Sequence, residues 1–288
     1  MIMRDLAVAL QYSLPHRFLS RIMFYLTRSE WRWVKNTFIR QIVKRYKVDM
    51  ADALEPDLAA YPSFNAFFTR ALKPGARPIA GGADLLLSPA DGAISQAGAV
   101  TDGRILQAKG MDYSAAELLG DSELAKTFAN GSFATVYLSP RDYHRLHMPI
   151  AGKLLRTLHV PGRLFSVATW TAESIPRLFA RNERLVCIFE TEHGLVALVL
   201  VGAIFVSSID TVWGGTVTPP YAQKIVDTRL DDGPSLMAGA EMGRFNMGST
   251  AIVLTEKPIQ FDADIAAAMP VKMGRPLGRF AARLGEKI

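Results

Sequence analysis

Cysteine is almost absent from this chain. Cys187 is the one cysteine among 288 residues, so the chain cannot form an intramolecular disulfide, and the composition fits a reducing compartment. It lies in the apolar run Leu185–Phe189, which is typical of a small buried side chain rather than of a redox or catalytic group.

Long apolar runs are also missing. No uninterrupted run reaches the roughly 18 residues that would indicate a membrane-spanning helix. The segment Leu6–Leu14 is short, contains Gln11 and Ser13, and precedes no small-residue cleavage site, so it does not resemble a signal peptide. There is no internal repeat, no low-complexity stretch and no glycine pattern typical of nucleotide binding. With 49% hydrophobic and 21% charged residues, the composition is that of a globular protein.

Positive charge is concentrated at the N-terminus. Residues 1–48 contain ten Lys or Arg and two acidic residues, a net charge of +8, whereas the remaining residues sum to −2. The same segment carries eight of the 27 aromatic residues. A basic segment interleaved with aromatic and aliphatic side chains suits an anionic bilayer surface. The alternatives are a helical cap with a solvated basic face, and a nucleic-acid-binding patch, which the large apolar share disfavours.

The first part of the chain, residues 1–72, is predicted to be mainly helical. Apolar residues recur there at three- and four-residue spacing, the period of one helix face. Pro15 and residues 27–29 are predicted breaks between short helices. The recurring apolar positions are Leu6, Leu10, Leu14, Phe18, Ile22 and Tyr25.

From Leu85 onward the pattern changes to that of β-strands. Two of the expected strands flank residues 191–194, a connection of hairpin length. Many strands with a few intervening helices predict an α+β fold, in which N-terminal amphipathic helices precede a β-rich, mainly antiparallel core resembling a sandwich or barrel. The expected strands are 93–99, 105–108, 133–138, 154–160, 185–190, 195–201, 203–209 and 250–255.

A segment with two histidines begins with a pattern typical of a helix start. Ser139 is a favoured N-cap, Pro140 suits the first helical position, and Asp142 completes a capping box. His144 and His147 would then lie on one face of that helix. On this pattern alone, two half-exposed histidines are the main alternative to a functional pair. A metal site is disfavoured, because no cluster of further ligands with suitable spacing occurs.

Two other segments carry reactive groups. Asp91 lies in the sequence Pro-Ala-Asp-Gly, which on its own indicates a β-turn in which the Asp side chain bonds its own backbone. Ser249 precedes the apolar run 251–254 and is predicted to open a strand. Gly248 before it gives the backbone freedom to present its carbonyl to the Ser249 hydroxyl.

Taken together, residues 88–92, 139–149 and 248–250 offer a serine, a carboxylate and two histidines. This set, in this order, resembles the bacterial phosphatidylserine decarboxylases, which are pyruvoyl-dependent membrane enzymes. One departure is Met247, where that family usually has Leu or Val. Methionine is apolar, as those two residues are. The resemblance covers most of the chain and extends to residues 67–70, 105–110, 179–184, 211–220 and 241–245.

The resemblance implies that the chain processes itself. The Ser249 hydroxyl attacks the carbonyl of Gly248, and elimination from the resulting ester cuts the chain into a β chain, residues 1–248, and an α chain, residues 249–288. The cut leaves a pyruvoyl group at the new N-terminus. No external cofactor is then required.

Residue roles follow from the same resemblance. His147 is the base that activates Ser249, and Asp91 orients His147. The ketone at position 249 forms a Schiff base with the amine of phosphatidylserine and accepts the electron pair left by CO2, which yields phosphatidylethanolamine. His144 then protonates the substrate carbon. The candidates for substrate contact are Tyr137, Phe165 and Ser166.

The resemblance also implies a peripheral enzyme on the cytoplasmic face of the inner membrane. Residues 1–72 would form the membrane-associating region and residues 73–288 the catalytic core. The expected partners are phosphatidylserine, an anionic membrane surface, the two chains of the cut precursor with each other, and a second copy in a homodimer. Nucleic acid and metal ions are not expected.

Two other functions fit parts of the pattern. A membrane-associated serine hydrolase would use Ser249, His147 and Asp91, but the chain lacks a Gly-x-Ser-x-Gly motif at Ser249. A membrane-associated binding module without chemistry would use mainly the N-terminal helices. A hydrolase or a binding module would stay one chain, whereas the decarboxylase would become two.

Overall fold

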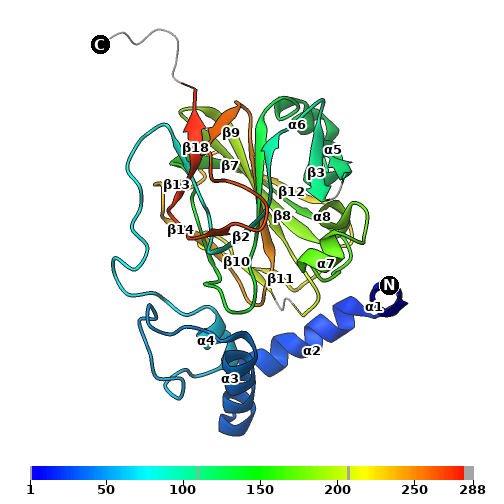
Figure 1. Ribbon diagram of the computed structural model, residues 1–288, viewed down its shortest axis with the longest axis vertical. Helices are drawn as coiled ribbons and strands as arrows, with labels where there is room; N and C mark the ends of the chain where they lie inside the picture. The colour runs from blue at the N-terminus through cyan, green and yellow to red at the C-terminus, as the bar shows by residue number, and fades with distance from the viewer. Residues whose placement is uncertain (1, 109, 206–207, 282–288) are drawn as a thin grey trace.

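The N-terminal part of the chain folds into helices beside the rest of the molecule. The computed structural model describes residues 2–108, 110–205 and 208–281. Pro15 and Ser29 lie in the breaks between the first three helices, which confirms the predicted breaks. Figure 1 shows these helices in blue, below the strands. They are α1 (Ile2–Ser13), α2 (His16–Arg28), α3 (Arg32–Tyr46) and the short α4 (Phe64–Phe68).

A small aromatic cluster holds α3 and α4 together. Ser63 caps α4 by accepting a hydrogen bond from the Ala66 amide. The helix then buries three phenylalanine rings, each worth about 1.5–3 kcal/mol when removed from water. Met247 packs against this cluster, so the helical region contacts the segment that contains Ser249. The buried members are Ile39, Val48, Tyr61, Phe64, Phe67 and Phe68.

A large antiparallel sheet forms the centre of the molecule. It stays open between its two edge strands in the part of the chain that the structure describes, so the core is layered and does not close into a barrel. Its strands in spatial order are β12 (Val226–Arg229), β7 (Gly152–Val160), β8 (Arg184–Thr191), β9 (Gly194–Val201), β15 (Thr250–Thr255), β5 (Ser132–Tyr137), β2 (Gly92–Ala99) and β17 (Pro270–Val271), with β13 (Ser235–Leu236) also paired to β7.

Helices and a hairpin cover one face of this sheet. Ile252 and Leu254 of β15 point into the apolar cluster on that side, together with residues of the covering elements. Figure 1 shows these elements on the right of the molecule. They are β3 (Arg104–Ala108), β4 (Met111–Ser114), α5 (Ala115–Leu119), α6 (Ser122–Thr127), α7 (Thr169–Ala172) and α8 (Leu178–Arg181).

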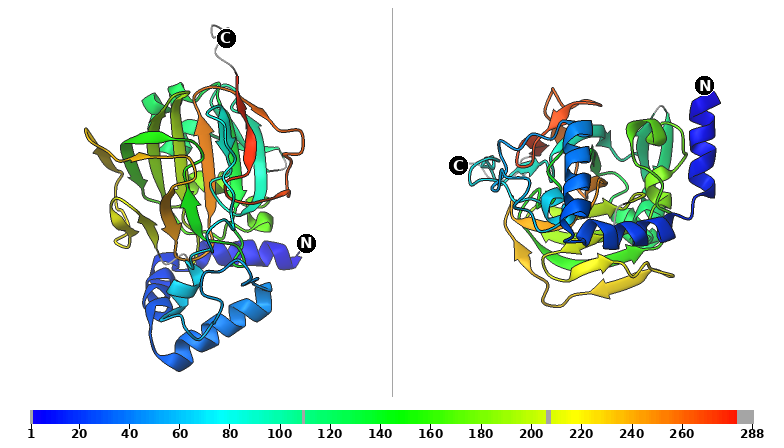
Figure 2. Two further views of the ribbon diagram at one scale, coloured as in Figure 1. Left: turned by 90° about the vertical axis from the view of Figure 1, so that its left-hand side faces the viewer. Right: turned by 90° about the horizontal axis from the view of Figure 1, so that it is seen from below.

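Two smaller antiparallel sheets cover the other face, as the turned views in Figure 2 show. Ala251 and Val253 of β15 point to this side. Both faces of β15 are therefore buried, which explains why its sequence is a continuous apolar run. One small sheet is β11 (Gly215–Thr218), β10 (Ile209–Thr211), β14 (Glu241–Phe245) and β6 (Arg145–His147), and the other is β1 (Leu85–Leu87), β18 (Pro276–Phe280) and β16 (Ile259–Phe261).

The strand predictions are confirmed with one exception. Seven of the eight expected strands are present with ends shifted by at most two residues, and residues 191–194 form the expected hairpin. The strand expected at 203–209 is wrong, because β9 ends at Val201 and β10 begins at Ile209. Phe205 has a φ of 65°, a left-handed conformation that interrupts an extended strand. Residues 206 and 207 lie outside the described part.

None of the helices in the described residues combines the length and the apolar composition needed to cross a membrane.

Gly92, directly after Asp91, occupies a position with no room for a side chain. A Cβ atom there would lie 2.2 Å from the Tyr137 carbonyl oxygen. We expect Gly92→Ala to lower the free energy of unfolding by about 1–3 kcal/mol, because β2 and β5 must separate to admit the methyl group. Chemical denaturation measures this change.

Gly98 in the same strand provides the matched control. A Cβ atom there would meet its nearest neighbour at 3.9 Å, so Gly98→Ala should be neutral or raise the free energy of unfolding by about 0.5–1 kcal/mol. Equal losses in the two variants would contradict the close approach at Gly92.

Candidate active site

Ser249 is fully buried at the entrance to β15. Its carbonyl accepts a hydrogen bond from the Leu138 amide at 2.9 Å, and its hydroxyl donates to the Met247 carbonyl at 3.3 Å. A Cβ atom on Gly248 would lie 3.3 Å from the Leu138 carbonyl oxygen and 3.8 Å from Nε2 of His144. The Gly248–Ser249 peptide is therefore enclosed, with an imidazole beside it.

His144 is held in one tautomer. Its Nδ1 lies 2.8 Å from the carbonyl oxygen of Asp142, so Nδ1 carries the proton and donates it. Nε2 has no hydrogen-bond partner among the described residues. The ring packs against Phe68 of α4 with 4.0 Å between centroids, and burial lowers the pKa of His144 to about 3. His144 is thus neutral, and its unpartnered Nε2 lies beside Gly248.

His147 has both nitrogens occupied. Nδ1 donates to the Gly239 carbonyl at 2.8 Å, and Nε2 lies 3.0 Å from the hydroxyl of Tyr143. Burial raises the pKa of Tyr143 to about 12, so this hydroxyl stays protonated and donates to Nε2. Burial also lowers the pKa of His147, while the Gly239 carbonyl and the charges of Glu241 and Asp91 oppose that shift.

The prediction of a helix beginning at Ser139 is wrong. The capping contact does form, since the Asp142 carboxylate accepts a hydrogen bond from the Ser139 amide at 2.7 Å. The chain makes only one turn, however, and then enters β6, where Arg145 and His147 pair with β14. His144 and His147 therefore do not share a helix face, and their ring nitrogens meet different neighbours.

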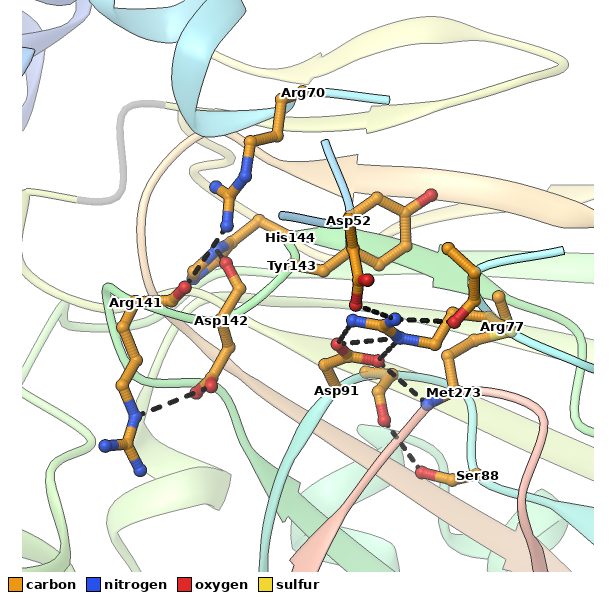
Figure 3. Close-up of polar contacts among 12 residues, drawn as sticks. Asp52, Arg70, Arg77, Ser88, Asp91, Arg141, Asp142, Tyr143, His144 and Met273 are labelled. Atoms are coloured by element: carbon orange, nitrogen blue, oxygen red, sulfur yellow. Dashed lines mark hydrogen bonds and ion pairs between the residues drawn. The ribbon is translucent and has the colours of Figure 1, made fainter. Parts of the chain in front are cut away.

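Asp91 pairs with an arginine that the sequence did not indicate. Nε of Arg77 lies 2.9 and 3.0 Å from the two carboxylate oxygens, and a terminal nitrogen lies 2.5 Å from one of them (Figure 3). The Met273 amide donates to Asp91 at 2.9 Å, and Asp52 accepts from the other side of Arg77 at 2.7 Å. These contacts replace both the turn predicted for the Asp91 side chain and the direct contact expected with His147.

The backbone nevertheless brings the Asp91 and His147 segments together. The His147 amide donates to the carbonyl of Pro89 at 2.8 Å, and the Ser88 hydroxyl closes the same turn on Ala90 at 2.8 Å. The carboxylate and the imidazole are near enough for the charge of Asp91 to raise the pKa of His147. The structure thus places the two groups in one neighbourhood without a hydrogen bond between them.

The three candidates for substrate contact lie in two places. Tyr137 in β5 pairs with Thr250, one residue from Ser249, and lines a pocket of about 220 Å³. Phe165 contacts the rings of Tyr12 and His16 at 5.1 and 5.4 Å between centroids. The Ser166 amide donates to Gln11 at 2.9 Å. Phe165 and Ser166 therefore lie against α1 and α2, and of the three candidates only Tyr137 is placed beside the Ser249 segment.

Sequence reasoning missed Arg77 and the contact of Phe68 with His144. Arg77 follows a Pro-Gly pair in a loop, where no spacing or motif marks it. Tyr143 lies inside the segment of interest, so its position could have suggested a partner for a histidine. No group of three or more His, Cys, Asp or Glu side chains in the described ranges is placed to hold a metal ion.

Comparison with known proteins identifies related sequences along most of the chain. A family model described as phosphatidylserine decarboxylase matches residues 64–279, and another, described as PSD, matches residues 6–47. The phosphatidylserine decarboxylase proenzyme of Pseudomonas fluorescens is 54% identical over 281 residues, which cover 96% of this chain and 97% of the relative. The proenzymes of Pseudomonas aeruginosa and Alkalilimnicola ehrlichii are each 55% identical, over 94% and 86% of this chain and 96% and 88% of their own lengths.

The neutral state of His144 predicts a dependence of stability on pH. In the unfolded chain the His144 imidazole binds a proton below its ordinary pKa of 6.5, whereas in the folded chain it stays neutral down to about pH 3. The contribution of buried, neutral His144 to the free energy of unfolding is therefore fully present above pH 6.5 and is lost as the pH falls below it. Between about pH 6.5 and 4.5, a Ser249→Ala chain should lose about 2–3 kcal/mol more than the same chain with His144→Asn.

Denaturant titrations at several pH values measure the difference. Other buried histidines contribute equally to both chains, so the comparison isolates His144. Parallel pH profiles for the two chains would show that His144 is not held neutral.

Proposed function

This chain belongs to the phosphatidylserine decarboxylase family, and we propose that it acts through a pyruvoyl group made from its own Ser249. The chain is a self-processing decarboxylase that converts phosphatidylserine to phosphatidylethanolamine. The observation that carries the proposal is the enclosed Gly248–Ser249 peptide with the free Nε2 of His144 beside it. The description of the relatives as proenzymes supports a step in which the chain is cut.

The proposed cut balances with the groups of this chain and one water molecule. A base takes the Ser249 hydroxyl proton, Oγ attacks the Gly248 carbonyl carbon, and the amide nitrogen leaves with a proton, so an ester replaces the peptide bond. Removal of the Ser249 Cα proton expels the Gly248 carboxylate and leaves a dehydroalanine. This group tautomerises to an imine, and water then releases ammonia and leaves the ketone.

We assign the role of base for this cut to His147, with Asp91 as its positioning residue. Burial lowers the pKa of His147 and the charge of Asp91 partly opposes that shift, while the Pro89 carbonyl fixes the His147 backbone beside the Asp91 turn. For Nε2 to accept the serine proton, Tyr143 must release it first. A second assignment has His144 as the base, and its unoccupied Nε2 facing Gly248 favours it.

After the cut, the ketone at position 249 supplies an electron sink, because it binds the substrate amine and accepts the electron pair left by CO2. The role proposed for His144 is to deliver the proton to the substrate carbon. Its Nδ1 is fixed by the Asp142 carbonyl, which leaves Nε2 as the atom that carries this proton. Phe68 and the surrounding layers exclude water from the carbon, where a stray proton would compete.

Residues 1–72 are proposed to bind the cytoplasmic face of the inner membrane, and residues 73–288 to form the catalytic core. The supporting observation is that α2 is amphipathic in the reverse sense. It buries the polar residues His16, Ser20 and Thr27 against the protein, and four of its apolar side chains are exposed: Phe18, Ile22, Tyr25 and Leu26. The outward apolar side chains of this region include Phe18, Ile22, Tyr25, Trp31 and Trp33, which are 41–71% exposed.

An outward apolar stripe beside basic residues fits the interface of an anionic bilayer better than water. The basic side chains of residues 1–48 would interact with lipid phosphates while the aromatic rings insert among the headgroups. The homodimer that the resemblance implies stays a prediction.

The histidine assignment predicts different defects in four variants. Ser249→Ala, His147→Ala and Asp91→Asn should each leave a single uncut chain, because the nucleophile, its base or the group that positions the base is lost. His144→Ala should still be cut into residues 1–248 and 249–288 but release CO2 at least about 100-fold more slowly. Denaturing electrophoresis and a CO2-release assay measure the two steps.

Tyr143→Phe tests the contact seen at His147. It frees Nε2, so the cut should be at least as fast as in the wild-type chain. An uncut His144→Ala chain combined with a normally cut His147→Ala chain would transfer the role of base to His144.

The reversed amphipathicity of α2 predicts membrane binding with a salt-resistant part. Basic residues near an anionic surface contribute about 1 kcal/mol each and are screened by salt, whereas inserted apolar side chains are not. Phe18→Ser combined with Tyr25→Ser should abolish flotation with anionic vesicles at high salt and only weaken it at low salt. Met237→Ser, which changes a side chain 74% exposed in the catalytic core, is the matched control and should bind like wild type. Undiminished binding of the double variant at high salt would place the membrane surface elsewhere.

A further inference from the structure

Arg70, directly after α4 and Thr69, is a buried cation that forms no ion pair with the described residues, although Asp91 and Asp142 lie within electrostatic range. It is 4% exposed, and a terminal guanidinium nitrogen donates to the Arg141 carbonyl at 3.2 Å. Nε and the other terminal nitrogen have no hydrogen-bond partner among the described residues, and no acidic side chain in the described part forms an ion pair with it. Its guanidinium carbon also lies 5.5 Å from the centroid of the Phe67 ring.

Arg184 shows how this fold treats a buried arginine that serves structure. It is 2% exposed, and its three guanidinium nitrogens donate to the carbonyls of Leu118, Asn182 and Glu117. Burying a cation costs several kcal/mol unless it is paired and its donors are satisfied. Arg184 meets the second condition, since all three of its guanidinium nitrogens donate, and Arg70 meets neither. The unused donors of Arg70 are therefore suited to an anion.

The position of Arg70 connects it to the candidate active site. The carbonyls of the consecutive residues Arg141 and Asp142 accept hydrogen bonds from Arg70 and from Nδ1 of His144, respectively, as Figure 3 shows. Phe68, two residues before Arg70, packs on the His144 ring. Arg70 is also near enough to His144 for its charge to lower the pKa of that histidine. The two side chains thus lie side by side.

Arg70 lines a pocket of about 290 Å³ at the junction of the helical region and the core. Lys47, Arg141 and Lys272 line the same pocket. Four acidic side chains also line it: Asp52 and Asp91 pair with Arg77, Asp142 lies 3.8 Å from Arg141, and Asp49 accepts a hydrogen bond from the Ala51 amide. With Arg70 and Arg77 included, five basic side chains face four acidic ones, which leaves one positive charge in excess for a ligand that carries negative charge.

We propose that Arg70 binds the phosphodiester of the phosphatidylserine headgroup. The proposal rests on the proposed function, because it places the substrate amine at position 249. In the substrate, only two carbon atoms and one oxygen separate that amine from phosphorus, so an anion-binding group is required close to the reacting carbon. Arg70, beside His144, fulfils this requirement, and a guanidinium matches phosphate with paired donors.

The substrate carboxylate is the less suitable anion for Arg70. Its charge disperses as CO2 leaves, so a fixed cation would stabilise the substrate more than the transition state and slow the reaction. The phosphodiester keeps its charge throughout, and binding it stabilises both states equally. Loss of such an interaction raises KM and leaves kcat nearly unchanged.

The test compares mature Arg70→Met, Arg70→Lys and Arg184→Met enzymes on soluble short-chain phosphatidylserine. Arg70→Met should raise KM roughly 10- to 100-fold with kcat within about threefold of wild type. Its thermal midpoint should stay the same or rise, because an unpaired buried charge is removed. Arg70→Lys should restore part of the affinity. Arg184→Met should lower the thermal midpoint and leave KM unchanged.

An unchanged KM in Arg70→Met, or a fall in kcat alone, would overturn the proposal. If Arg70→Met is not cut, binding of glycerophosphoserine to Ser249→Ala and to Ser249→Ala/Arg70→Met replaces the kinetic test. Weaker binding in the double variant supports the proposal, and equal binding overturns it. Inorganic phosphate that binds more tightly than glycerophosphoserine would indicate a site for free phosphate and overturn the headgroup assignment. This binding test remains valid even if wild-type chain proves to be uncut.

Discussion

The central position of β15 is the constraint on which the rest of the structure depends. The strand pairs with β9 on one side and β5 on the other, and both of its faces are buried. Ser249 precedes its first residue, and the Leu138 amide holds the Ser249 carbonyl. The candidate nucleophile is thus attached to a strand that is paired on both sides and buried on both faces, which fixes its position relative to the sheet.

The same constraint bears on what happens after a cut. Hydrogen bonds on both sides of β15 would keep the new N-terminus in place, and β16, β17 and β18 are paired with other strands as well. Two chains without a disulfide can therefore stay together through the sheet alone.

Around Ser249, charged and polar side chains have their hydrogen bonds and ion pairs satisfied to different degrees. Asp91 and Arg77 neutralise each other, whereas Arg70 and Nε2 of His144 have unused hydrogen-bonding capacity.

The strand pattern was predictable, because alternating or continuous apolar runs report burial directly, as residues 250–255 illustrate. The absence of a helix after Ser139 was not predictable. The capping contact of Ser139 with Asp142 does form, but it is local, and the pairing of residues 145–147 with β14 determines the conformation of the segment. The partner of Asp91 is an arginine in a loop 14 residues away, which no spacing rule identifies. The period of α2 was also correct, but periodicity cannot tell which face meets the protein, and the polar face does.

The central claim is that Ser249 becomes the carbonyl of the active enzyme. A denaturing mass spectrum of freshly purified, active protein tests it most directly. The account predicts two chains, residues 1–248 and residues 249–288, with the shorter one lighter than its sequence by one molecule of ammonia. Active enzyme with the mass of a single intact chain, or a shorter chain that still begins with an unmodified serine, would contradict it.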